Sequence, residues 1–272
     1  MTTRSLYIAS PEGETGKSTV ALGVVDLLSR TVQRVGVFRP VARSTDERDY
    51  VLELLLKHDG VDLEYEDCIG VPYDQVHADP EAALTEILNR FHEVSRHTDA
   101  VVIVGTDYTD VSGPAELAFN ARIAANLGAP VLLVVSGNDR SIPEVVQTAE
   151  LAITEMEANH AQVISIIANR TTVDSHDELS AALNELRNSW VIPEDRFLSA
   201  PTVGQIMKAL DGELISGDEE LLNREALDML VGAMNLEHLL GRLTDGAVVI
   251  TPGDRADVML GLVTSHVAEG FP

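Results

Sequence analysis

Short apolar runs recur along the first two thirds of the chain, and longer stretches with helical spacing separate them. The runs have the length of β-strands and cover residues 6–9, 35–38, 100–104, 131–135 and 163–168. Unbroken runs rich in Val and Ile are typical of parallel strands that are covered on both faces. Because such strands alternate with helical stretches, the pattern predicts a doubly wound, mainly parallel α/β sheet.

The stretches between the runs predict helices with recognisable ends. Pro80 is suited to the first turn of one helix, and another begins at Gly113-Pro114 and ends before Gly128. An earlier helix follows a Gly-Lys-Ser turn. Its apolar positions are expected to share one face: Val20, Val24, Leu27 and Leu28.

The pattern changes after about residue 174, where a polar helix over residues 178–188 leads into shorter, glycine-richer segments. We therefore expect a larger domain over residues 1–190 and a smaller α/β domain over residues 197–272. Because proline biases the residue before it toward extended structure, the ending Phe271-Pro272 suggests a further strand and an incomplete smaller domain. Its predicted elements are a helix over 203–210, one or two helices over 224–240, a strand over 247–251 and a helix over 254–268.

The chain is strongly acidic, with 19 Lys and Arg against 44 Asp and Glu and a formal net charge of −25. This charge repels nucleic acids and anionic lipids, so neither is an expected partner. No apolar run approaches the ~18 residues of a membrane span, no signal peptide precedes the first strand, and the single Cys68 cannot form an intramolecular disulfide. We expect a cytoplasmic protein.

A phosphate-binding motif follows the first predicted strand and opens the first predicted helix. In such a loop, backbone N–H groups surround the phosphates, Lys17 reaches the terminal phosphates and Ser18 binds Mg²⁺. The expected cofactor is Mg²⁺ with ATP or a related nucleotide. The candidate nucleotide-binding residues in this segment are Gly13, Glu14, Thr15, Gly16, Lys17, Ser18 and Thr19.

The motif departs from the general pattern at one position. Pro11 occupies the place of the first glycine of G-x-x-x-x-G-K-[ST], while Gly13 supplies some of the missing flexibility. We interpret the segment as a phosphate site; a structural remnant and a chance match are the alternatives.

Acidic residues near the ends of two strands are candidate metal ligands. Asp107 follows the strand over residues 100–104, and Asp46 and Asp49 follow the second strand. Carboxylates in such positions commonly bind Mg²⁺ or its water. The alternative for Asp107 is a hydrogen bond to the backbone of its own turn.

Three further residues at strand ends are candidate nucleotide contacts. Arg39 would bind a phosphate or carboxylate, with a surface ion pair as the alternative. Asn169 carries both a donor and an acceptor and could bind a base edge, or else cap the next turn. Arg170 follows it directly.

These features together resemble two known domains. Residues 5–190 resemble the dethiobiotin synthetase-like domain, and residues from about 197 resemble a DRTGG-type domain. In this order the two resemble the amino-terminal half of long-form bacterial phosphate acetyltransferases. The segments that carry the resemblance are Gly16-Lys17-Ser18, Phe38-Arg39-Pro40-Val41, Asn120, residues 127–134, Asn169-Arg170, and residues 200–203, 222–225, 232–234 and 249–255.

The resemblance implies a regulatory and oligomerisation role in an enzyme that converts acetyl-CoA and phosphate into acetyl phosphate and CoA. The implied partners are a nucleotide or metabolite effector such as NADH or pyruvate, further copies of the chain, and a carboxyl-terminal acetyltransferase domain. That catalytic domain would be absent from this chain, which would not be catalytic alone.

The sequence also departs from both families. Dethiobiotin synthetases carry Lys where Arg39 stands and Glu where Val104 stands, and their loop is one residue longer, which places Ser10 at the first-glycine position. After Asp254-Arg255 the DRTGG signature is not intact. Two alternatives therefore stay open: an ATP-dependent carboxylate or amine ligase of the dethiobiotin synthetase type, and a free-standing nucleotide-sensing module.

Overall fold

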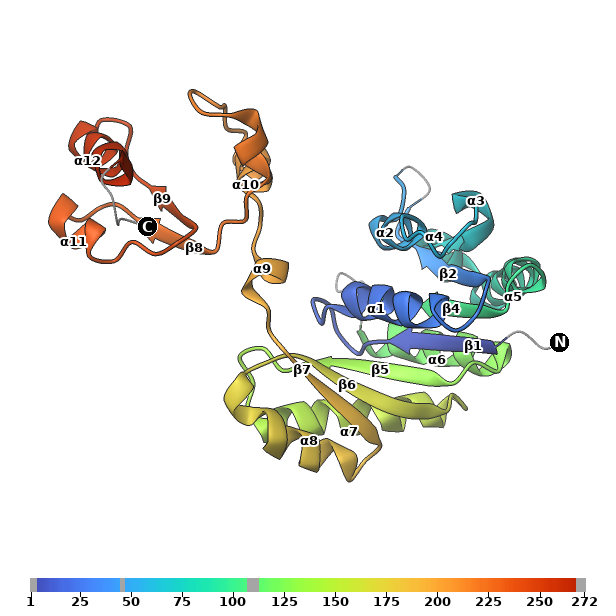
Figure 1. The fold of residues 1–272 in the computed structure, drawn as a ribbon. Helices are drawn as coiled ribbons and strands as arrows, with labels where there is room; N and C mark the ends of the chain where they lie inside the picture. The colour runs from blue at the N-terminus through green and yellow to red at the C-terminus, as the bar shows by residue number, and fades with distance from the viewer. Residues whose placement is uncertain (1–3, 45–46, 107–112, 268–272) are drawn as a thin grey trace. The chain divides into compact units, whose positions relative to one another are not determined.

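The computed structural model describes residues 4–44, 47–106 and 113–267. The chain divides into a larger unit, Met1–Glu194, and a smaller unit, Asp195–Pro272 (Figure 1).

Seven parallel strands form the sheet of the larger unit, in the order β3-β2-β4-β1-β5-β6-β7. The expected doubly wound, mainly parallel α/β fold is thereby confirmed, and each of the five predicted strands is present. Because β1 lies between β4 and β5, the loops that follow these strands meet at the carboxyl edge, where folds of this kind bind ligands. The strands are β1 (Arg4–Ala9), β2 (Val35–Ala42), β3 (Ile69–Pro72), β4 (Ala100–Val104), β5 (Val131–Ser136), β6 (Val163–Thr171) and β7 (Asn188–Pro193).

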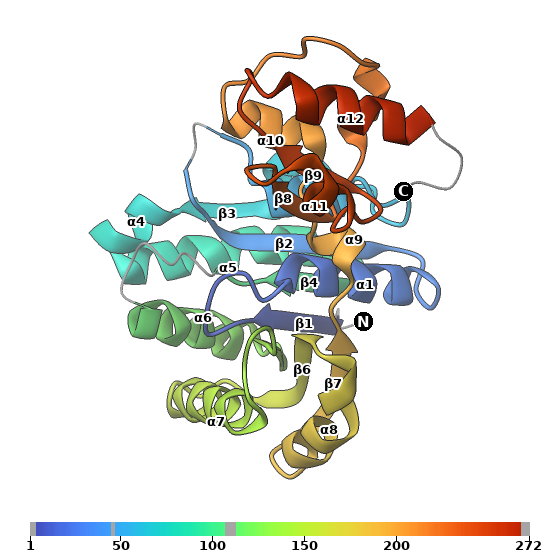
Figure 2. The same ribbon diagram turned by 90° about the vertical axis from the view of Figure 1, so that its left-hand side faces the viewer.

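Helices cover both faces of this sheet (Figure 1, Figure 2). On one face α1, α2 and α3 bury their apolar side chains, and on the other α5, α6, α7 and α8 do so. β4 and β5 are buried along their whole length, which explains their unbroken Val and Ile runs. The helices are α1 (Lys17–Ser29), α2 (Tyr50–Leu56), α3 (Tyr65–Cys68), α4 (Tyr73–Ala78), α5 (Pro80–Arg96), α6 (Gly113–Leu127), α7 (Ile142–Ala158) and α8 (His176–Asn184), with a 3₁₀ turn η1 (Val173–Ser175).

Two details of the helices predicted in the larger unit are wrong. The polar helix expected over residues 178–188 ends at Asn184, because residues from Asn188 onward pair with β6 as the edge strand β7. Leu27, expected on the buried face of α1, is 62% exposed. The buried face is instead formed by Val20, Ala21 and Val25.

The smaller unit contains a short parallel pair, β8 (Asp228–Val231) and β9 (Ala247–Ile250). The helices predicted over residues 224–240 are therefore partly wrong: their first half contains β8, because pairing with β9 overrides local preference, and only Leu236–Leu240 is helical. Among its described residues, the buried hydrophobic side chains are Ala226, Leu239 and Val258. The remaining elements are α9 (Arg196–Ser199), α10 (Val203–Ala209), η2 (Glu219–Asn223), α11 (Leu236–Leu240) and α12 (Ala256–Val267).

Within the described ranges, every helix is too short or too polar to cross a membrane.

Candidate functional site

The loop between β1 and α1 has a tightly defined backbone. Gly16 immediately precedes α1 and has a φ of 75°, in the left-handed region that favours glycine. A Cβ atom at this position would lie 2.3 Å from Nδ2 of Asn169. Glu14, which is not a glycine, also has a positive φ of 58°. The sequence Glu14-Thr15-Gly16 therefore follows a path that surrounding residues must support.

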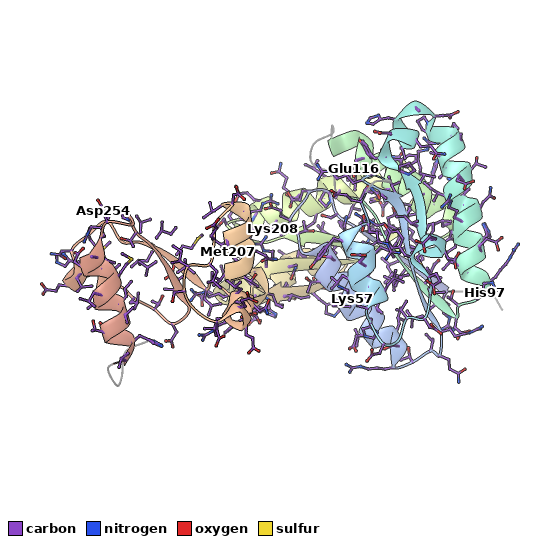
Figure 3. The ribbon with its side chains drawn as sticks, turned by 90° about the horizontal axis from the view of Figure 1, so that it is seen from above. Lys57, His97, Glu116, Met207, Lys208 and Asp254 are labelled. Atoms are coloured by element: carbon purple, nitrogen blue, oxygen red, sulfur yellow. The ribbon has the colours of Figure 1, made fainter. Side chains whose placement is uncertain are left out.

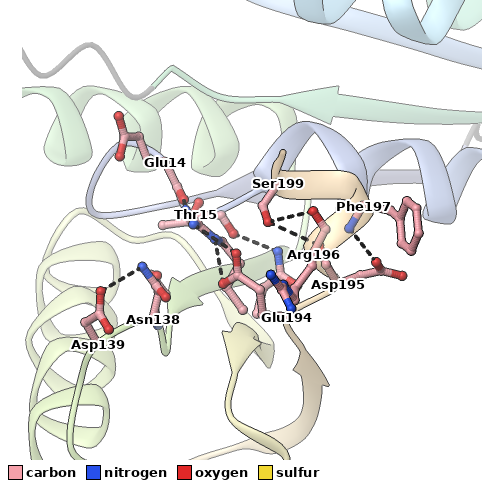
Figure 4. A network of polar contacts seen from close by, with 12 residues as sticks. Glu14, Thr15, Asn138, Asp139, Glu194, Asp195, Arg196, Phe197 and Ser199 are labelled. Carbon is pink, nitrogen blue, oxygen red and sulfur yellow. Dashed lines mark hydrogen bonds and ion pairs between the residues drawn. The ribbon is translucent and has the colours of Figure 1, made fainter. Parts of the chain in front are cut away.

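Part of that support comes from the end of β6. Asn169 Nδ2 donates a hydrogen bond to the carbonyl of Thr15 at 2.8 Å, and Arg170 Nη1 donates to the carbonyl of Glu14 at 2.9 Å. Figure 4 shows Glu14 and Thr15 within this network of polar contacts. Because the C=O and N–H of a trans peptide point in opposite directions, the N–H groups of Thr15 and Gly16 face away from these two side chains. Successive N–H groups arranged in this way form an anion-binding concavity.

A second support comes from the loop after β5. Arg140 pairs with the carboxylate of Glu12 through two hydrogen bonds of 2.6 Å each. Their side chains are 31% and 27% exposed, and the hydrogen bond to Glu12 raises the pKa of Arg140. Ser10 Oγ also donates to the carbonyl of Glu12 at 2.7 Å. These contacts fix the part of the loop that begins with Pro11 in place of glycine.

The three motif residues that follow the loop lie in the first turn of α1. Lys17 is buried, with 3% of its surface exposed, while Ser18 is half-buried and Thr19 is exposed. The partial positive charge of the helix terminus acts at the same place. Within the described residues, the hydroxyl of the buried Thr15 has no hydrogen-bond partner, an unusual state for a buried polar atom. The Lys17 cation, the amino terminus of α1 and the N–H groups of the loop therefore lie together.

Arg39 and Asp49 are in contact with each other. The Arg39 side chain is 3% exposed and that of Asp49 is 7% exposed, and Nε of Arg39 lies 3.1 Å from Oδ2 of Asp49. Arg39 Nη1 also donates to the carbonyls of Val104 and Gly105 at the end of β4, while Asp49 accepts from the N–H of Leu52 and caps α2. In this geometry both residues support the fold, and their roles in ligand or metal binding stay predictions.

The other two candidate metal ligands, Asp46 and Asp107, lie outside the described residues. Within the part of the chain that is described, no group of three or more His, Cys, Asp or Glu side chains could hold a metal ion. Ser18 supplies one hydroxyl beside Lys17. Because Mg²⁺ keeps several waters and binds mainly through nucleotide phosphates at such loops, this single hydroxyl fits a metal that arrives with a nucleotide.

The sequence interpretation missed a buried network behind the β4 end. Tyr7 donates its hydroxyl hydrogen to Oδ1 of Asn120 at 2.6 Å, and the N–H of Thr106 donates to the same oxygen at 3.0 Å. Asn120 Nδ2 donates to the carbonyl of Glu116 at 2.9 Å, and Glu116 is marked in Figure 3. Burial raises the pKa of Tyr7, which keeps its proton. A polar Asn within the apolar face of a helix is the signal that could have identified this network.

Comparisons with known proteins agree with the fold. A family model described as an AAA domain matches residues 4–210, and a DRTGG domain model matches residues 205–269. The predicted order, a P-loop domain followed by a DRTGG-type domain, is confirmed.

Two curated relatives are the phosphate acetyltransferases of Nitratidesulfovibrio vulgaris and Synechocystis sp., which are 31% and 28% identical over 283 residues. The matches cover 98% and 99% of this chain, and the chain spans 40% of the length of each relative.

Two solved structures are similar at low identity. A putative plasmid partition protein from Borrelia burgdorferi bound to AMPPNP has a TM-score of 0.46 and 14% identity, and the match covers 82% of this chain and 95% of that chain. The MinC:MinD cell division protein complex of Aquifex aeolicus has a TM-score of 0.45 and 15% identity, over 80% and 99%.

Proposed function

Since the chain belongs to the AAA domain family over residues 4–210, we propose that it binds a nucleotide at the loop after β1 and regulates a phosphate acetyltransferase of which it is the amino-terminal part. The intact enzyme would transfer an acetyl group between CoA and phosphate, and the rest of that protein would perform this reaction. We also propose that the intact protein is a homo-oligomer. The curated relatives, which are more than twice as long as the matched region, support this division of labour.

One observation carries the proposal of nucleotide binding. Asn169 and Arg170 hold two successive loop carbonyls on one side, which directs the N–H groups of Thr15 and Gly16 to the other side. Lys17 and the amino terminus of α1 follow immediately. This combination gives a phosphate group several donors and a positive charge despite the net charge of −25.

The proposed contacts are the predicted ones. The loop residues 13–16 would surround the phosphates, Lys17 would neutralise their charge, and Ser18 would contact a nucleotide-bound Mg²⁺. One amide N–H of Asn169 already donates to the loop, so contact with a base would use the second N–H or the amide oxygen.

Three arginines already contact protein acceptors, which favours regulation over phosphoryl transfer. Arg39 pairs with Asp49, Arg140 pairs with Glu12, and Arg170 bonds to Glu194 and the loop. Phosphoryl transfer depends on cations that stabilise charge on the transferred group, and these three cations already have protein acceptors. We therefore propose that the chain binds a nucleotide without turnover. The ATP-dependent ligase is the second hypothesis.

The test is a calorimetric titration of the chain with ATP, ADP and NADH in the presence of Mg²⁺, together with a phosphate-release assay. We expect saturable binding and no phosphate release. Lys17→Ala should weaken binding by roughly tenfold or more because charge-assisted contacts to phosphate are lost. The matched control is Lys57→Ala, which removes an exposed lysine directly after α2 (Figure 3) and should leave the affinity unchanged.

Each other outcome has a defined meaning. Equal affinities of the wild type and Lys17→Ala would contradict the phosphate site, and the absence of any binding would make the loop a structural remnant. Phosphate release would instead support the ligase.

A further inference from the structure

Arg170 makes contacts in two directions. One guanidinium nitrogen, Nη1, donates to the carbonyl of Glu14 in the loop at 2.9 Å. The other two, Nε and Nη2, donate to the carboxylate of Glu194 at 3.2 and 3.1 Å. The Arg170 side chain therefore links the phosphate-binding loop to Glu194. Figure 4 labels Glu14 and Glu194, the two residues that it joins.

Glu194 is the last residue of the larger unit. Its backbone N–H donates to the carbonyl of Thr171 at 2.9 Å, so both its main chain and its side chain are fixed to the end of β6. The Arg170–Glu194 pair thus anchors the chain at the point where one unit ends and the next begins.

The two residues joined by the hydrogen bond to the loop both have a strained backbone. Arg170 has a φ of 60° and Glu14 a φ of 58°, although neither is a glycine. Such conformations persist only where surrounding contacts over-determine them, and they concentrate at ligand-binding and switch regions. The Arg170 and Glu194 side chains are 28% and 24% exposed, so water screens their attraction less than it would at the surface.

A phosphate in the loop would alter this balance. It would bring negative charge to the N–H side of the peptides whose carbonyls Asn169 and Arg170 hold. A hydrogen bond from the Thr15 N–H to the phosphate would polarise that peptide, so the Glu14 carbonyl would become a stronger acceptor and would compete with the Glu194 carboxylate for the Arg170 guanidinium.

We propose that Arg170 couples nucleotide binding at the loop to the junction after Glu194. A bound nucleotide draws the guanidinium toward the loop, weakens its bonds to Glu194 and loosens the residues that follow. Arg170 acts here as a positioning residue. This inference rests on the proposed nucleotide-binding function.

Thermodynamic linkage makes the proposal quantitative. If the nucleotide weakens the Arg170–Glu194 pair, then removal of the pair must strengthen nucleotide binding by up to the same factor. For one partly shielded ion pair, we expect this factor to be roughly threefold to tenfold.

The experiment measures tryptic cleavage after Arg196, an exposed arginine two residues beyond Glu194. The 272-residue chain is digested with and without Mg²⁺-ATP, and the rate at which the fragment ending at Arg196 appears is followed by mass spectrometry. We expect nucleotide to accelerate this cleavage by roughly threefold to tenfold in the wild type. In Glu194→Gln, cleavage should be fast without nucleotide, and nucleotide should not accelerate it further.

The control variant is Glu86→Gln, which removes a more exposed ion pair with Arg90 on α5 and should behave like the wild type. Arg170→Lys, which keeps the charge but loses the two-pronged contact, provides a second test if Glu194→Gln does not fold. Nucleotide binding is measured by calorimetry in the same samples, so that the two proposals can fail separately.

If the wild type binds nucleotide but its cleavage rate does not change, the coupling is wrong and the proposed function stands. If cleavage of Glu194→Gln still responds to nucleotide as the wild type does, Arg170 is not the link. If the wild type binds no nucleotide, the proposed function and the coupling are both overturned.

Discussion

Gly16→Ala should destabilise the larger unit because this position combines a left-handed backbone with a close side-chain neighbour. A φ of 75° costs a residue with a Cβ atom about 1–2 kcal/mol. The new Cβ would lie 2.3 Å from Asn169 Nδ2, so the amide must move away from the Thr15 carbonyl that it now contacts at 2.8 Å. Loss of that hydrogen bond adds about 0.5–1.5 kcal/mol.

The sum, about 1.5–3.5 kcal/mol, corresponds to a melting temperature about 3–14 °C lower for a unit of this size. The single tryptophan of the chain, Trp190, lies on β7, so its fluorescence reports on this unit during thermal or urea unfolding. The same substitution should weaken nucleotide binding, because the loop N–H groups shift with the displaced carbonyl.

Gly23→Ala is the matched control. Gly23 lies inside α1, and apart from its chain neighbours and the nearby backbone of the helix no atom lies within 4 Å of its added Cβ, so alanine there should stabilise the helix by about 0.5–1 kcal/mol. The double variant Gly16→Ala/Asn169→Ala removes the close contact and should be no less stable than Gly16→Ala alone. If Gly16→Ala melts at the same temperature as Gly23→Ala, the reasoning about the loop geometry is refuted.

Two further predictions concern ion pairs. Arg39→Met leaves the carboxylate of Asp49 and the carbonyls of Val104 and Gly105 without their cation, so urea unfolding followed by Trp190 fluorescence should show a loss of about 3–5 kcal/mol. An unchanged midpoint would contradict the structural role. In the smaller unit, the hydrogen bond from Arg255 lowers the pKa of Asp257 to about 2. Because this folded-state pKa lies below the unfolded value of about 3.9, the contribution to stability is present above pH 4 and is lost as the pH falls toward 2. Arg255→Ala should raise the Asp257 pKa toward its ordinary value in an NMR titration, and a pKa that stays near 2 would show that another group is responsible.

The central strands could be predicted because their environment leaves a direct mark on the sequence. A parallel strand covered on both faces must be apolar at nearly every position, as residues 100–104 are. The edge strands lack this mark. β3 has only four residues, with Gly70 and Pro72 among them, and β7 exposes Trp190 and Ile192. Each gains its strand conformation from pairing with one neighbour, which short-range periodicity cannot reveal.

The phosphate loop was recognisable because its chemistry is local: strand, Gly16-Lys17-Ser18 and helix follow one another in the chain. Its supports could not be recognised in the same way. Asn169 lies 154 residues from the carbonyl that it contacts, and Arg170 lies 156 residues from its own. The fold brings them together through the β1–β5–β6 order of the sheet.

The residue types at these strand ends also allow two interpretations, contact with a nucleotide or contact with a loop carbonyl. Composition does not distinguish between them. An amide or guanidinium that could bind a nucleotide can equally bind a loop carbonyl, since both ligands are hydrogen-bond acceptors. The direction of the peptide groups distinguishes the two interpretations. Carbonyls turned toward Asn169 and Arg170 mean N–H groups turned away from them. The two side chains therefore serve a bound anion indirectly, by fixing the backbone dipoles that would hold it, and a strongly acidic chain needs those fixed dipoles most because its overall field repels the ligand.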